Sequence, residues 1–195
     1  MRRLGLVAVA SLELMLIVGL SIPSEAMMVK RPLAERVREA DYVVAGTVVS
    51  RQSRRHPSRA MVWSDFTIRV EEAMKLPGGE TAPSTVGVRV PGGRMGRWIV
   101  RVSDVPVFEP SQRVILLLRA SRVAGLCHVV SGSDGAFRVL RDPVSQQEVV
   151  ANEAGELLMD VDARRVAPAL VAQPSAVTLP RFRQHLRELV NETSR

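Results

Sequence analysis

Short segments in which apolar and polar residues alternate follow one another along the middle of the chain, separated by turns rich in Gly and Pro. Between Val62 and Glu72, for example, Phe66, Ile68 and Val70 alternate with polar side chains. A period of two puts successive side chains on opposite faces of a strand, so each segment predicts a β-strand with one buried face. Many such strands joined by Gly/Pro turns predict a mostly β fold, either a barrel or a sandwich.

Within this pattern, two segments indicate how the sheet is built. Arg113–Arg119 is apolar on both faces and is expected to be the most deeply buried strand. The long first strand, Asp41–Ser50, carries Gly46 in its middle, which predicts a bulge or sharp bend. Because strands must bend to close a barrel, we expect a small closed barrel of the OB type. The turn Gly132–Gly135 predicts a hairpin between strands 126–131 and 136–140.

Short helices are expected at both ends of this β region. Pro32–Ala40 has a Pro suited to the first turn and apolar residues on one face. Leu179–Val190 keeps helical apolar spacing after Thr178, a suitable N-cap residue. Residues 163–177 are rich in Ala and Pro and predict an irregular linker.

The N-terminus has the features of a secretory leader. Arg2 and Arg3 precede an apolar stretch, Leu4–Ile22, and small residues at Ser24 and Ala26 form a cleavage site. We expect a signal peptide at residues 1–26, an OB-like domain at 27–162, and a linker with a C-terminal helix at 163–195. The protein is then secreted or periplasmic, and soluble once the leader is cleaved. The alternative is an uncleaved membrane anchor.

Basic residues form the strongest surface feature. The formal net charge is +7, and Ser50–Arg59 concentrates four Arg and one His in a segment expected to join the first two strands. Arginine grips carboxylates and phosphates bidentately, so an acidic protein surface or anionic envelope lipid is the expected partner. Export and the lack of an aromatic platform argue against nucleic acid. The alternative is a solvated, mobile hairpin loop. The candidate binding residues are Arg51, Arg54, Arg55, His56 and Arg59, with Arg94 in the Gly-rich connection Pro91–Gly96.

No pattern predicts catalysis, a metal or a cofactor. Cys127 and His128 are neighbours on an expected strand, so they point to opposite faces, and Cys127 is expected to be a small buried apolar residue. The three His residues lack partners at metal-binding spacing. Pro91–Gly96 lacks the Gly-Lys-Ser/Thr of a phosphate-binding loop and is expected to be a flexible turn.

Five segments together resemble the netrin-like and TIMP-like OB-fold domains, and a family of uncharacterised secreted bacterial proteins of that kind. The segments span roughly residues 35–142. They are Ala40–Ser50, Asp65–Lys75, Val88–Gly93, Phe108–Leu118 and Gly132–Val139. The resemblance implies a fold more than an activity. TIMP-like inhibitors chelate a protease zinc through an N-terminal disulfide-bonded Cys, whereas this chain has only Cys127 and an expected mature N-terminus at Met27.

These observations favour an exported, non-catalytic binding or inhibitory module that contacts a protein partner, a protease or an envelope protein, through the loops of its barrel. The alternatives are an envelope hydrolase whose site is assembled from distant residues, and a structural envelope component. A hydrolase requires a deep pocket that holds convergent His or carboxylate groups.

Overall fold

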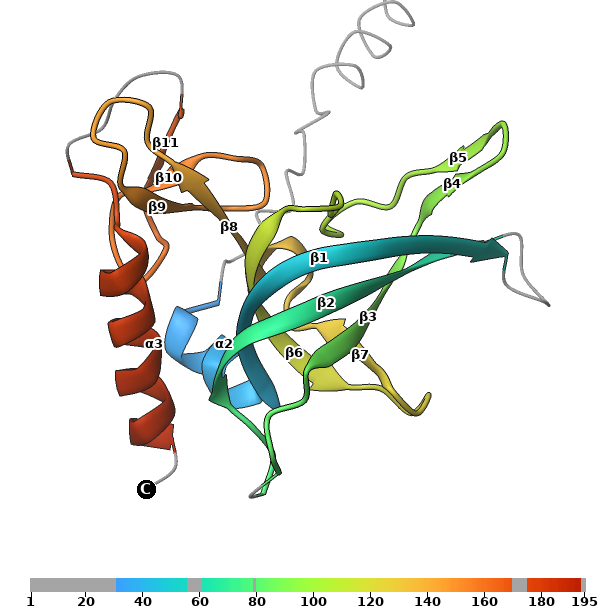
Figure 1. Cartoon of the computed structure of the whole chain (residues 1–195), viewed down its shortest axis with the longest axis horizontal. Coiled ribbons are helices and arrows are strands. Elements are labelled where there is room, and N and C mark those ends of the chain that lie inside the picture. The colour runs from blue at the N-terminus through green and yellow to red at the C-terminus, as the bar shows by residue number, and fades with distance from the viewer. Residues whose placement is uncertain (1–30, 56–60, 79, 170–174, 194–195) are drawn as a thin grey trace, which may run out of the picture. The chain divides into compact units, whose positions relative to one another are not determined.

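The computed structural model describes residues 31–55, 61–78, 80–169 and 175–193. In these ranges the fold is mostly β, as predicted, with the two expected α-helices near the ends (Figure 1). The helices are α2 (Leu33–Glu39) and α3 (Leu179–Thr193). The strands are β1 (Tyr42–Arg55), β2 (Val62–Lys75), β3 (Thr85–Pro91), β4 (Gly93–Met95), β5 (Trp98–Val100), β6 (Arg113–Ala120), β7 (Leu126–Val129), β8 (Ala136–Arg141), β9 (Glu148–Ala151), β10 (Leu157–Leu158) and β11 (Val166–Ala167). The predicted signal peptide lies outside the described residues.

Five strands of the large sheet form a ring in the order β1, β2, β3, β7, β6 and back to β1. All neighbours in the ring are antiparallel except β3 and β7, which run parallel through Gly87–Leu126 and Val88–Cys127. Strands β8 to β11 extend the sheet beyond β6. The order places β1 between β2 and β6, so the first half of β1 closes the ring.

The bend expected at Gly46 is present. The β1–β2 register shifts between Ala45 and Gly46, and again between Val48 and Ser50. A Cβ at Gly46 would lie 2.2 Å from the Arg69 carbonyl oxygen, so β2 packs against this position too closely for a side chain. Past these shifts β1 no longer pairs with β6, and its outer half continues with β2 as a two-stranded ribbon, residues 50–55 and 62–67 (Figure 1).

Strand β6 separates two apolar cores, which explains why both of its faces are apolar. Val114, Leu116 and Leu118 enter the cluster inside the ring. Ile115 and Leu117 enter a second cluster between the sheet and the helices. All five side chains are at most 1% exposed, so the prediction of a deeply buried strand is confirmed.

The second core includes the C-terminal region. Phe182 and Leu186 of α3 are fully buried beside Val37 of α2. The segment before α3, predicted as an irregular linker, contains β11, and Val177 within it is 1% exposed and exchanges backbone hydrogen bonds with Val150 and Leu158. The described residues from Arg31 onward therefore form one compact unit.

Two sequence-based predictions of connections are wrong. Strands β7 and β8 do not pair as a hairpin: both pair with β6, β7 opposite Leu118–Ala120 and β8 opposite Val114–Leu116. A 3₁₀ turn at Gly132–Gly135 joins them, so β7 and β8 form one interrupted strand along the same edge of β6. The Gly-rich connection Pro91–Gly96 is not a simple turn either, because Gly93–Met95 forms β4 and pairs with β5.

The basic segment was expected to be a loop, and this is also wrong for its described part. Residues 51–55 continue β1 and pair with β2 as far as Arg55 opposite Val62. His56 and Arg59 lie outside the described residues. Among the residues that the structure describes, no helix has the length and apolar character needed to cross a membrane.

Candidate functional site

Pairing with β2 divides the basic part of β1 between two faces. Residues opposite each other in an antiparallel pair share a face. The cross-strand partners are Phe66 for Arg51, Val62 for Arg55 and Trp63 for Arg54. Phe66 and Val62 are buried toward the ring side of the ribbon, so Arg51 lies on this inner face. Arg55, the last residue of β1, borders hollows on both faces. Arg54 lies on the outer face with Trp63.

A hollow of about 460 Å³ opens on the inner face, and we call it the inner pocket. The ribbon, the end of β3, strands β4 and β5, and residues 101–109 surround it. Its apolar lining includes Phe66, Val90 and Val107. Arg51 and Arg94, both predicted as binding residues, line it together with Arg101, which the sequence analysis missed.

Two glycines explain how the chain reaches across the ribbon to form this pocket. Gly92 and Gly93 have φ values of 92° and 134°, which side chains rarely allow. A Cβ at Gly93 would lie 2.1 Å from the Ser64 hydroxyl oxygen, and that hydroxyl donates a 2.9 Å hydrogen bond to the Gly92 carbonyl. Ser64 is 1% exposed. The crossing is therefore fixed by close packing and by a buried hydrogen bond.

Positive charge dominates the inner pocket. The Arg51 guanidinium lies 5.8 Å from the centre of the Phe66 ring and 3.6 Å from the Glu109 carboxylate. Glu109 is the one carboxylate in the lining, and its side chain is 68% exposed. Arg94 and Arg101 are exposed and form no ion pair within the described ranges. Guanidinium groups around an apolar floor suit a ligand that combines an apolar group with carboxylates.

On the outer face, arginines are already paired. Asp65 accepts hydrogen bonds from Arg89 Nε at 2.6 Å and Nη2 at 2.8 Å, and lies 3.1 Å from Arg54 Nε. The Arg89 hydrogen bonds lower the pKa of Asp65, against the opposing effect of burial. A shallow pocket of about 420 Å³ beside this cluster includes Trp63 and His128. Because Asp65 offsets two of its arginines, this face offers less free positive charge than the inner pocket.

The Asp65 cluster predicts an acid-sensitive contribution to stability. A carboxylate whose folded-state pKa is lowered stabilises the fold above its ordinary pKa of 3.8, and this contribution is lost as pH falls through the folded-state value. We expect Asp65→Asn to lower the free energy of unfolding by about 2 kcal/mol at neutral pH. The difference in free energy of unfolding between the wild type and Asp65→Asn should become smaller below pH ~3.9. Urea denaturation at several pH values would measure this difference. If this difference stayed constant down to the lowest pH, the assignment would be contradicted. Glu109→Gln, which removes an exposed carboxylate, is the control.

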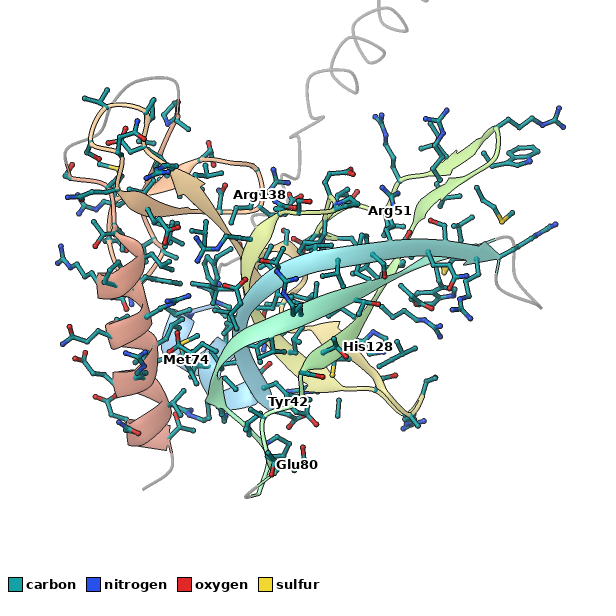
Figure 2. The ribbon with its side chains drawn as sticks, viewed as in Figure 1. Tyr42, Arg51, Met74, Glu80, His128 and Arg138 are labelled. Carbon is teal, nitrogen blue, oxygen red and sulfur yellow. The ribbon has the colours of Figure 1, made fainter. Side chains whose placement is uncertain are left out.

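The two remaining candidate residues, His128 and Cys127, make contacts that belong to the fold and not to a reactive site. His128 is exposed, with Nδ1 3.2 Å from the Arg89 carbonyl oxygen and Nε2 3.0 Å from the Ser121 hydroxyl (Figure 2). Cys127 points into the ring interior and is 7% exposed, as predicted for a small buried residue. Burial raises the pKa of its thiol to about 11, so the thiol stays protonated at neutral pH and is a poor nucleophile.

The structure thus brings together Arg51 and Arg94 and separates them from Arg54. Arg55 lines a different hollow, between the ribbon and β5. Arg101 could have been found from its position at the end of an acid-free basic stretch.

A scan against protein-family models and a search of curated proteins found no match to this chain.

Proposed function

We propose that the protein is an exported, non-catalytic binding module built on an OB-like barrel. The five-strand ring and the bend at Gly46 support the barrel, since an OB fold is a small, partly open barrel of five strands. The leader-like residues 1–26 support export. In an OB-like barrel the first long hairpin contributes to the binding surface, and here the ribbon provides one wall of the inner pocket.

The partner is a protein, a protease or an envelope protein, that presents an apolar residue beside carboxylates. The inner pocket carries this proposal, because Arg51, Arg94 and Arg101 line it beside apolar residues that include Phe66 and Val90. Buried apolar contact provides affinity, and guanidinium–carboxylate hydrogen bonds provide orientation. The pocket opens to solvent and adjoins residues 101–104, all of which are exposed, and this suits a chain segment that continues past the pocket.

The same geometry favours binding over hydrolysis. A general acid or base needs a pKa near the working pH, and arginine stays charged throughout that range. Glu109 lines the inner pocket, but it is exposed and lies 3.6 Å from Arg51, and His128 lies on the outer face, so the two do not meet in one site.

A photo-crosslinking experiment tests this function. A photoreactive residue at Val107, which is 50% exposed and lines the inner pocket, is expected to give one discrete adduct in the exported fraction of the native cells. The same residue at Val144, which is 73% exposed and lies outside the pocket, is the control. Changing Arg51, Arg94 and Arg101 to Gln should reduce the adduct at least tenfold, because charge-assisted hydrogen bonds contribute about 1.5–3 kcal/mol each. The proposal fails if no discrete adduct forms, if Val144 crosslinks equally, or if the triple change has no effect on a folded protein.

A further inference from the structure

The β4–β5 hairpin, residues 93–100, has an unusual composition. No acidic residue occurs between Glu80 and Asp104. Within and directly after the hairpin lie three arginines, Arg94, Arg97 and Arg101, none of which forms an ion pair in the part of the chain that the structure describes. The hairpin therefore carries concentrated, uncompensated positive charge.

The same hairpin exposes large apolar side chains. Trp98 is 62% exposed and Ile99 is 57% exposed. Met95 pairs with Trp98, and Arg94 with Ile99, so apolar and basic side chains are neighbours across the two strands. The Arg97 guanidinium lies 5.3 Å from the centre of the Trp98 ring. Contiguous exposed apolar residues of this size mark an interaction site.

The hairpin projects beyond the ring as a sheet of its own (Figure 1). Its base is fixed at Gly93 against Ser64, while nothing lies within 4 Å of a Cβ at Gly96 in the turn. A gap of about 320 Å³ remains between the hairpin and the ribbon, lined by apolar residues that include Met61 and Trp98. Among the described residues, the ribbon therefore does not bury Trp98, which stays 62% exposed.

We propose that the β4–β5 hairpin docks on an anionic lipid surface, with Trp98 and Ile99 in the interfacial region and the three arginines against headgroup phosphates. Charge complementarity selects this occupant, because each arginine near an anionic surface strengthens binding about fivefold. Trp is favoured at the membrane–water interface. A projecting tip with two large apolar side chains can insert into lipid, whereas a stable protein interface buries about 800 Å² per partner. This site shares Arg94, Ile99 and Arg101 with the inner pocket, but Arg97 and Trp98 do not line that pocket, so changes at these two residues test lipid docking apart from the proposed function.

Vesicle binding by the purified protein tests the proposal. Co-sedimentation should show binding to vesicles of phosphatidylglycerol with phosphatidylcholine, and little binding to phosphatidylcholine alone. The double change Arg97→Gln with Trp98→Ser alters only the tip. It should lower the partition coefficient roughly fiftyfold, about fivefold from the lost charge and about tenfold from the lost indole. Val144→Ser, which removes another exposed apolar side chain, should leave the partition coefficient unchanged.

Fluorescence locates the inserted residue. The chain has two Trp residues, so Trp63→Phe leaves Trp98 as the sole tryptophan. Its emission should shift to the blue on anionic vesicles and be quenched by brominated lipid. Three results would overturn the proposal: equal binding to neutral vesicles, no quenching of Trp98, or binding that the tip variant does not weaken. A lipid-free dimer that the tip variant dissociates would overturn it too, because a second copy would then cover the hairpin.

Discussion

Alanine in place of Phe182 is expected to lower the free energy of unfolding by about 4 kcal/mol. Phe182 is fully buried in α3, and its ring packs edge-on against Phe137 of β8 with ring centres 4.9 Å apart. The change would leave a cavity in the core that joins both helices to the sheet. In a protein of this size, such a loss should lower Tm by roughly 12 °C. Urea and thermal denaturation followed by circular dichroism would measure both quantities.

The control for this prediction lies one residue away on the same helix. Arg181 is exposed, so Arg181→Ala should change stability by no more than about 0.5 kcal/mol. The prediction would be contradicted if Phe182→Ala unfolded only α3 and left the cooperative unfolding of the sheet unchanged, because α3 would then not share a core with the sheet. The shared core makes us expect one transition, with helix and sheet signals lost together.

Adding a single methyl group at Gly46 is expected to cost about 3 kcal/mol. In Gly46→Ala the new Cβ would lie 2.2 Å from the Arg69 carbonyl oxygen and 3.1 Å from Ile68 Cγ2. The nearest obstacle is backbone of the paired strand, so β1 and β2 must separate at the bend that closes the ring. Urea denaturation would measure the loss.

Gly155→Ala separates this packing effect from the backbone preference of glycine. Gly155 has a φ of 86°, and a Cβ added there would meet no atom within 4 Å, so its substitution should cost about 1–2 kcal/mol from conformation alone. Equal losses in the two variants would mean that close approach at Gly46 is not what limits stability there.

The sequence was most informative where a residue's surroundings follow from its own strand. The apolar run 113–119 predicts burial on both faces because every second side chain must leave water, and β6 indeed lies between two cores. Gly46 predicts a bend for a comparable local reason, since a glycine inside a strand indicates either a bulge or a close approach. Both helices were likewise identified from their apolar spacing.

Partner choice between strands was harder to predict, because it depends on residues far away in sequence. The turn at Gly132–Gly135 has the composition of a hairpin turn, yet β7 and β8 each pair with β6 and not with each other. Strand β6 is buried and is longer than either of them. A strand at Arg97–Val102 is predicted and overlaps β5, but β4 and its pairing with β5 were missed because the Gly-rich segment Pro91–Gly96 has the composition of a turn. Arg101 lies at the end of an acid-free basic stretch, but that it lines the same pocket as Arg51 follows only from the fold.

The register shift at Val48 and Ser50 has a consequence for how this surface is encoded. Val49 is an extra residue there, without a partner in β2. Had β1 paired with β2 without this irregularity, strict alternation would turn Arg54 to the inner face and Arg51 to the outer one. The residue content of the ribbon would be the same, but the chemistry of its two faces would be exchanged. Which arginines lie on which face of the ribbon therefore depends on the one extra residue at this register shift. Deleting one residue there would exchange the two faces without any substitution.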